Sequence, residues 1–167
     1  YGFPAALGCS VATKGKRIIC IDGDGSFQMN IQELQTVAYN RLNVKIFILN
    51  NNGYHSIRQT QTNLFKQSLV GVCDGNGLNF PDMERIAYAY QIPFLRIDNI
   101  DDISEKVQQV LSTEGPVICE TVLDTAQNFE PKLSSKVLPD GSIVSPDIDD
   151  MFPFLSREEY EENHVKK

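Results

Sequence analysis

The stretch RIICIDGDGSFQMNIQELQTVAYNRLNVKIFILNNNGYHSIRQTQ, residues 17–61, decides the fold of this chain. It contains two apolar runs rich in Ile, Val and Phe, at 17–22 and 44–49, and each has the length of a strand. A glycine turn at 23–26 and a helical pattern at about 27–39 separate the two runs. Short apolar runs joined through a helix are typical of parallel strands that are buried on both faces.

The same alternation of helical and strand patterns extends over most of the chain. Apolar residues at helical spacing predict helices over residues 4–12, 81–90 and 101–111. Short apolar runs predict further strands at 94–97 and 116–123. This alternation indicates an α/β fold, a doubly wound and mostly parallel sheet with helices on both of its faces.

The sequence divides into two parts of different character. Residues 1–124 carry the alternating pattern and form the expected domain, whereas residues 125–167 have little apolar periodicity. We expect 125–151 to be an extended arm on the domain surface, followed by the charged end REEYEENHVKK. The prolines that interrupt this second part are Pro131, Pro139, Pro146 and Pro153.

Composition and charge exclude some classes of function. The net charge of −7 makes neither nucleic acid nor an anionic membrane surface a natural partner. No apolar run approaches the ~20 residues that span a bilayer, and the opening YGFPAALG is not a signal peptide. The cysteines lack the spacing of a metal site, and we expect a reducing cytoplasm. They are Cys9, Cys20, Cys73 and Cys119.

Polar residues follow both strands of the opening stretch, where a right-handed crossover would bring the strand ends side by side. Gly23 and Gly25 lack a Cβ and would let backbone approach a bulky anion, helped by the N–H groups of the following helix. Asp24 alone would repel a diphosphate, and a hard divalent cation removes that conflict. Mg²⁺ takes oxygen ligands, so Asp24, Asn51 and the carbonyl of Gly53 form a candidate clamp.

The motif GDG followed by NN resembles the diphosphate-binding signature of thiamine diphosphate enzymes. GDGSFQMNIQEL and the opening FPAALG are similar to acetolactate synthase large subunits, and the resemblance extends from Tyr1 to about Leu123. It implies that Asp24, Asn51 and Gly53 hold Mg²⁺. It also implies that these residues bind the cofactor together with Gly23, Gly25, Ser26 and Tyr54.

The resemblance further implies what the whole protein does. Family members decarboxylate a 2-keto acid and join the product to a carbonyl acceptor, in a site formed between subunits of a homo-oligomer, at least a dimer. There a glutamate on a pyrimidine-binding domain, of the same or a partner subunit, activates the cofactor, and FAD is possible in a middle domain. This chain would then be a C-terminal domain truncated at its N-terminus, inactive alone.

The segment after Gly53 departs from two branches of the family. Acetolactate synthases usually have a Trp where Thr60 stands here, whereas decarboxylases place a catalytic Glu at the position of Ile57. Both departures favour a carboligase with an acceptor other than pyruvate. His55 is a candidate acid or base because its unperturbed pKa lies near neutrality, and its alternative is a loop filler.

Other interpretations remain open. A 2-keto acid decarboxylase of the same family is one, and a degenerate, non-catalytic interaction module is another. A dinucleotide-binding turn would require a third glycine where Gln28 stands, and no GK[ST] phosphate loop occurs. Residues 62–79 lose periodicity, so we expect a lid that is poorly ordered without cofactor.

Overall fold

A computed structural model describes residues 1–65 and 69–164 of the chain. The chain consists of two compact units, Tyr1–Gln127 and Asn128–Lys167. Residues 66–68 of the segment expected to form a lid and the last three residues of the charged end lie outside the described residues.

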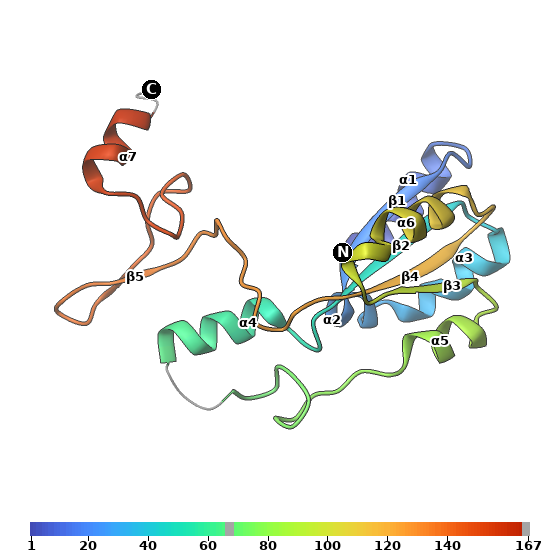
Figure 1. Ribbon diagram of the computed structural model, residues 1–167, viewed down its shortest axis with the longest axis horizontal. Coiled ribbons are helices and arrows are strands. Elements are labelled where there is room, and N and C mark those ends of the chain that lie inside the picture. The colour runs from blue at the N-terminus through green and yellow to red at the C-terminus, as the bar shows by residue number, and fades with distance from the viewer. Residues whose placement is uncertain (66–68, 165–167) are drawn as a thin grey trace. The chain divides into compact units, whose positions relative to one another are not determined.

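The first unit is built on a sheet of four parallel strands in the order β1-β2-β4-β3 (Figure 1). Each strand lies within one residue of its predicted position. Because all four run in one direction, their carboxyl ends meet at one edge, the edge predicted to carry the site. The strands are β1 (Ile18–Gly23), β2 (Val44–Asn50), β3 (Phe94–Ile97) and β4 (Val117–Val122).

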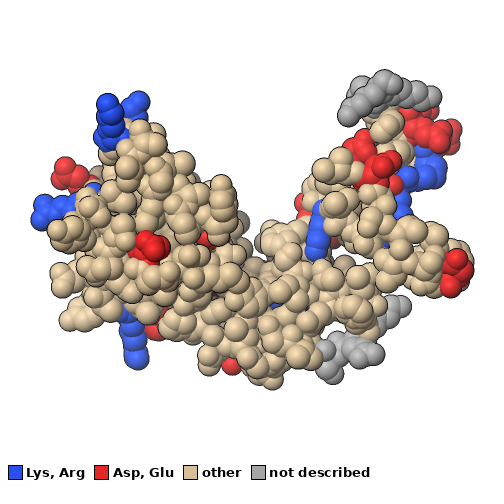
Figure 2. All heavy atoms as spheres, turned by 180° about the vertical axis from the view of Figure 1, so that it is seen from behind, with Lys and Arg blue, Asp and Glu red and all other residues tan. Residues whose placement is uncertain are grey.

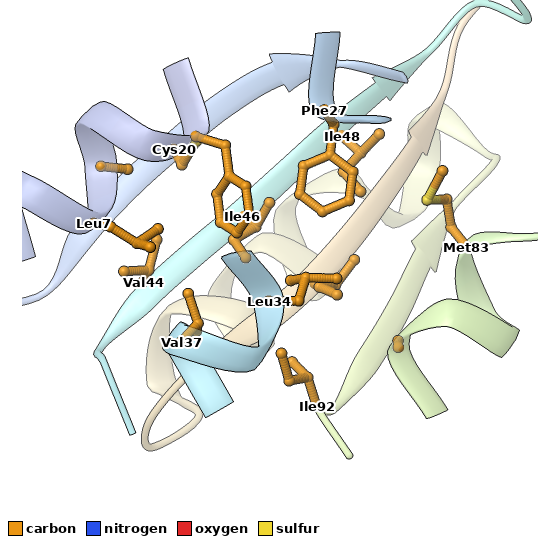
Figure 3. Close-up of a cluster of buried hydrophobic side chains, with 14 residues drawn as sticks. Leu7, Cys20, Phe27, Leu34, Val37, Val44, Ile46, Ile48, Met83 and Ile92 are labelled. Carbon is orange, nitrogen blue, oxygen red and sulfur yellow. The ribbon is translucent and has the colours of Figure 1, made fainter. Parts of the chain in front are cut away.

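Helices cover both faces of this sheet, as a doubly wound fold requires. The larger core lies on one face, where helical side chains pack onto Cys20, Ile46 and Ile48 of the strands (Figure 3). On the other face, Val110 of α6 packs with Ile97 and other buried strand residues. The helices that supply the first core are α1 (Gly2–Ala12), α2 (Asp24–Gln28), α3 (Leu34–Asn40) and α5 (Met83–Ala89), and α6 spans Ile103–Ser112.

The single helix predicted at about 27–39 is wrong in its extent. The chain turns helical already at Asp24, leaves the helix after Gln28, and resumes through a 3-10 turn at Ile31–Glu33 before α3. Asn30 has φ −136° and ψ 29°, outside the helical region. Asparagine favours such conformations because its side chain competes for backbone hydrogen bonds. The helical spacing of the apolar residues therefore reflected two short helices on one face.

Further short elements join these layers. Helix α4 (His55–Thr60) follows β2 and continues as a π-helical turn at Gln61–Phe65, and a 3-10 turn at Ile100–Asp102 precedes α6. Within the part of the chain that the structure describes, no helix has the length and apolarity to cross a membrane. Lys and Arg occur in separate places on the face shown in Figure 2 rather than as one basic area.

The second unit is more than the extended arm that the sequence predicts. It contains a small antiparallel hairpin, β5 (Lys136–Val137) with β6 (Ile143–Val144), and a helix α7 (Arg157–Asn163). Its centre is polar, because Asp150 is buried and paired with two cations. Lys136 Nζ lies 2.7 Å from Oδ2 and the guanidinium of Arg157 lies 2.8 Å from Oδ1. Hydrogen bonds from Arg157 and Lys136 lower the pKa of Asp150 to about 2.

Candidate cofactor site

Asp24 connects the carboxyl ends of β1 and β2, the two strands that carry the predicted site. It follows β1 directly as the first residue of α2, and only 2% of it is exposed. Its Oδ2 accepts a hydrogen bond from the backbone N–H of Gly53, 3.0 Å away, beyond the end of β2. Its Oδ1 accepts one from the N–H of Gly25 at 2.8 Å. The crossover has thus brought together two residues that the sequence separates widely.

The charge of Asp24 is only partly compensated. Burial raises the pKa of its carboxyl above the ordinary value, and the hydrogen bonds from Gly53 and Gly25 oppose that rise. The charge of Arg58 opposes it as well, but less strongly. A carboxylate whose ionised form is penalised by burial gains from a cation bound beside it. The position therefore favours metal binding.

Asn51 and Gly53 supply two further oxygen atoms at the same turn. The side-chain Oδ1 of Asn51 is buried and accepts no hydrogen bond, an uncommon state that a metal ligand would explain. Gly53 has φ +145°, and a Cβ there would lie 2.0 Å from the carbonyl oxygen of Val72. Its own carbonyl accepts a bond from His55 N at 3.1 Å and keeps a second lone pair.

These atoms have the chemistry of a magnesium site. Within residues 1–65 and 69–164, no group of three His, Cys, Asp or Glu side chains could hold a metal ion. Magnesium needs no such group, because it binds through one or two carboxylates and completes its shell with phosphate oxygens and water. The carboxylate of Asp24, the unpartnered amide oxygen of Asn51 and the carbonyl of Gly53 fit that requirement.

In the glycine turn, Gly23 has open space beside it, whereas Gly25 lies against an aromatic ring. Nothing lies within 4 Å of a Cβ placed on Gly23, whereas a Cβ on Gly25 would meet the ring of Tyr54 at 2.4 Å. The ring of Tyr54 in turn contacts that of Phe80 edge-on, with centroids 5.8 Å apart. The missing Cβ of Gly25 thus admits an aromatic ring, and Gly23 offers the open approach. Ser26 is exposed in the first turn of α2.

The segment beyond Gly53 forms α4. His55 begins this helix and is 5% exposed, so a substrate could reach its imidazole only if neighbouring groups moved. The catalytic role predicted for His55 stays a prediction. Ile57 is 48% exposed, and Thr60 at the end of the helix is also exposed. Neither side chain supplies the acid that a decarboxylase places at position 57.

No sequence pattern indicated Arg58, which lies in α4 and holds the turn at Asn51–Gly53. Its Nη2 donates to the carbonyl oxygens of Asn51 at 2.8 Å and Asn52 at 3.2 Å. These bonds fix the two peptide carbonyls that follow the Cα of Asn51. The available signal was a lone arginine in the helix that follows the paired asparagines, and spacing alone does not distinguish it from a solvated residue.

Comparisons with known proteins identify the group to which these features belong. Residues 1–121 match the family described as "Thiamine pyrophosphate enzyme, C-terminal TPP binding domain". An acetolactate synthase large subunit from Cyanidium caldarium is 37% identical over 80% of this chain and 23% of its own length. Chloroplastic acetolactate synthases from Zea mays and Nicotiana tabacum are 33% and 34% identical over 81% of the chain. The chain spans about a fifth of these relatives, between 21% and 23% of their lengths.

Proposed function

The chain belongs to the thiamine pyrophosphate enzymes as a C-terminal TPP-binding domain, and from this premise we propose that its sheet edge binds thiamine diphosphate through Mg²⁺. The observation that carries the proposal is the turn at Asn51–Gly53, held against the buried carboxylate of Asp24. Asp24, Asn51 and the Gly53 carbonyl would hold the metal. The open face of Gly23 would admit the diphosphate that the metal carries.

The residues of the predicted clamp and Arg58 bind and orient the cofactor. Asp24 fixes the turn through the Gly53 N–H and would bring its negative charge to the metal. Arg58 holds the carbonyls of Asn51 and Asn52, which keeps the Asn51 side chain in place. When bound, thiamine diphosphate supplies the carbanion chemistry of 2-keto acid decarboxylation and ligation. We propose that this chemistry requires a pyrimidine-binding domain of the same or a partner subunit in a homo-oligomer.

The metal-dependent binding can be measured directly. Thiamine diphosphate with Mg²⁺ should raise the melting temperature of the protein, and at ~100 times Kd the stabilisation is about 2.7 kcal/mol. Asp24→Ala should abolish the shift, because it removes the only carboxylate of the predicted clamp. Asp101→Ala is the matched control, since this exposed carboxylate lies in the 3-10 turn before α6 and has no assigned role in cofactor or metal binding. Absence of any shift in the full-length protein at millimolar ligand would favour a degenerate module.

The acceptor is a separate proposal. The relatives named above are acetolactate synthases. This chain has Thr60 where acetolactate synthases usually have Trp, and Ile57 where decarboxylases have a catalytic Glu. We propose that the full-length enzyme joins the donor unit to a carbonyl compound other than pyruvate. Product analysis with pyruvate alone and with added aldehydes or 2-keto acids tests this. Acetolactate as the dominant product under all conditions would overturn it.

Two further features stay proposals. FAD in a middle domain would be detected by the absorbance of the purified full-length protein. Cytoplasmic localisation is consistent with the free thiols of Cys9, Cys20, Cys73 and Cys119. The maize and tobacco relatives are named as chloroplastic, and localisation of the tagged full-length protein would decide between these compartments.

A further inference from the structure

A chain of polar contacts runs from β3 through β4 to the metal-binding turn. Arg96 Nη1 on β3 donates to Oε2 of Glu120 on β4 at 2.9 Å. The other carboxylate oxygen, Oε1, accepts from Asn50 Nδ2 at 2.6 Å. Asn50 ends β2, and its Oδ1 accepts from the backbone N–H of Asn52 at 2.9 Å. Three strands are therefore connected to the turn that carries Asn51 and Gly53.

We propose that Glu120 is a positioning residue that fixes the metal-binding turn through Asn50. The proposal rests on the function proposed above and adds a residue from a distant part of the chain. Glu120 is only 4% exposed, and each of its oxygens has a defined partner. It does not itself touch the predicted metal site, so its influence passes through the Asn50 amide.

The direction of the Asn50 amide is what Glu120 determines. A carboxylate can only accept hydrogen bonds, so Glu120 requires the NH₂ group of Asn50 to face it. The amide oxygen is then turned toward the N–H of Asn52, forming an Asx-turn. If the amide rotated by half a turn, its NH₂ group would oppose the Asn52 N–H, and two donors would meet. A carboxylate at position 120 excludes that arrangement.

The turn needs this support because its backbone is not in a favoured conformation. Asn52 has φ +57°, in the left-handed region, which is uncommon for residues with a Cβ, although asparagine adopts it more readily than most. The Asx-turn holds the N–H of Asn52, and Arg58 holds its carbonyl oxygen. The buried, unpartnered Oδ1 of Asn51 lies between these two supports in the sequence. A change in the Asn50 amide would therefore move the predicted ligands.

Arg96 compensates the charge of the buried Glu120 carboxylate. Its side chain is 52% exposed, so its charge is partly solvated while Nη1 pairs with Glu120. It also lies 3.7 Å from Asp98, whose side chain is 58% exposed and does not reach the turn. Asp98 is therefore a useful control, because it contacts the same arginine and lies outside the connection to Asn50.

A pair of isosteric exchanges tests the proposal in the full-length protein. Asn50→Asp places two carboxylates against each other, and it should weaken thiamine diphosphate binding in Mg²⁺ by ~10- to 100-fold. Adding Glu120→Gln should restore the affinity to within about threefold. The introduced glutamine donates to the introduced aspartate, whose other oxygen still accepts from Asn52. Asp98→Asn should leave the affinity unchanged.

A second readout does not depend on the cofactor. In the cofactor-free protein, the amide of Asn52 should exchange its hydrogen faster in Asn50→Asp and return to the wild-type rate in the double variant. Val110→Ala, in the core on the other face of the sheet, controls for general destabilisation and should leave both the affinity and this exchange rate unchanged.

Three outcomes decide the matter. Recovery of affinity and of Asn52 protection in the double variant supports the positioning role. A double variant as weak as Asn50→Asp, in either readout, overturns it. If the wild-type protein binds no thiamine diphosphate, the proposed function fails, and the exchange of Asn52 still decides whether Glu120 sets the turn.

Discussion

The two units of this chain are ordered by different forces. In Tyr1–Gln127, fully buried apolar side chains such as Phe3, Phe27 and Leu34 form the core. In the described part of Asn128–Lys167, no apolar side chain is buried, and the buried residue is the paired Asp150. Apolar burial is insensitive to pH, whereas a paired carboxylate depends on its ionisation. One chain thus contains a unit whose order does not depend on pH and a second unit whose order depends on the ionisation of a carboxyl group.

The largest expected effect is a loss of stability in the apolar core of the first unit. Phe27 is 0% exposed, and its ring lies 4.9 Å from that of Phe3. Phe27→Ala should lower the free energy of unfolding by about 3–5 kcal/mol, because it removes buried surface and leaves a cavity. Urea denaturation measures the change. Val137→Ala in the second unit, 58% exposed, should shift it by no more than about 0.5 kcal/mol.

A smaller effect is expected at Lys45, one of the buried polar residues of the first unit. Lys45 is 1% exposed, and its Nζ donates to the carbonyl oxygens of Thr113 at 2.6 Å and of Gly115. Burial lowers the pKa of Lys45. Lys45→Met should cost about 1–3 kcal/mol, because two carbonyls at the turn after α6 lose their donor. An unchanged urea midpoint would mean that water replaces the ammonium group.

In the second unit the expected effect is local. Asp150→Asn removes the charge that Lys136 and Arg157 share, and the unit should lose its hydrogen-exchange protection. The first unit should keep its protection and its denaturation midpoint, because its core lies elsewhere. Asp140→Asn, on an exposed turn of the same unit, is the control. Equal loss of protection in both units would contradict the division.

The smallest expected effect is the pH dependence of order in the second unit. Asp150 has a pKa of about 2 in the folded chain, below the ordinary 3.8, so its ionised form stabilises the second unit. That contribution is present above pH 3.8 and is lost as the pH falls toward 2. Hydrogen exchange in α7 should accelerate over this window. Asp150→Asn should remove that acceleration, and its persistence in the variant would assign it to another carboxyl group.

The fold could be predicted from the sequence where apolar runs were short and separate. The strands at β1, β2, β3 and β4 were found to within one residue, because burial on both faces leaves an unbroken apolar run. The break at Asn30 was missed, since apolar spacing continues on one face across it. The helix and hairpin of the second unit were missed because a polar centre leaves no periodic apolar pattern.

Part of the candidate site could be predicted as well. Strand order implied that Asp24 would meet the residues after β2, and its bond to Gly53 confirms that juxtaposition. The metal and cofactor roles of these residues stay predictions. Glu120 lies in an apolar run with no motif, so no local signal distinguishes it. Its connection to Asn50 depends on the pairing of β2 with β4, which only a three-dimensional structure reveals.

Gly53 sets a limit on how this turn could vary in a saturation library. With φ +145° and Val72 O only 2.0 Å from any added Cβ, every replacement must displace the neighbouring backbone. A screen of all twenty residues at this codon should therefore recover only glycine among folded, cofactor-binding clones. Position 101, which is exposed in the 3-10 turn before α6, should instead accept many residues, so the restriction would be specific to the turn that Gly53 forms against Asp24.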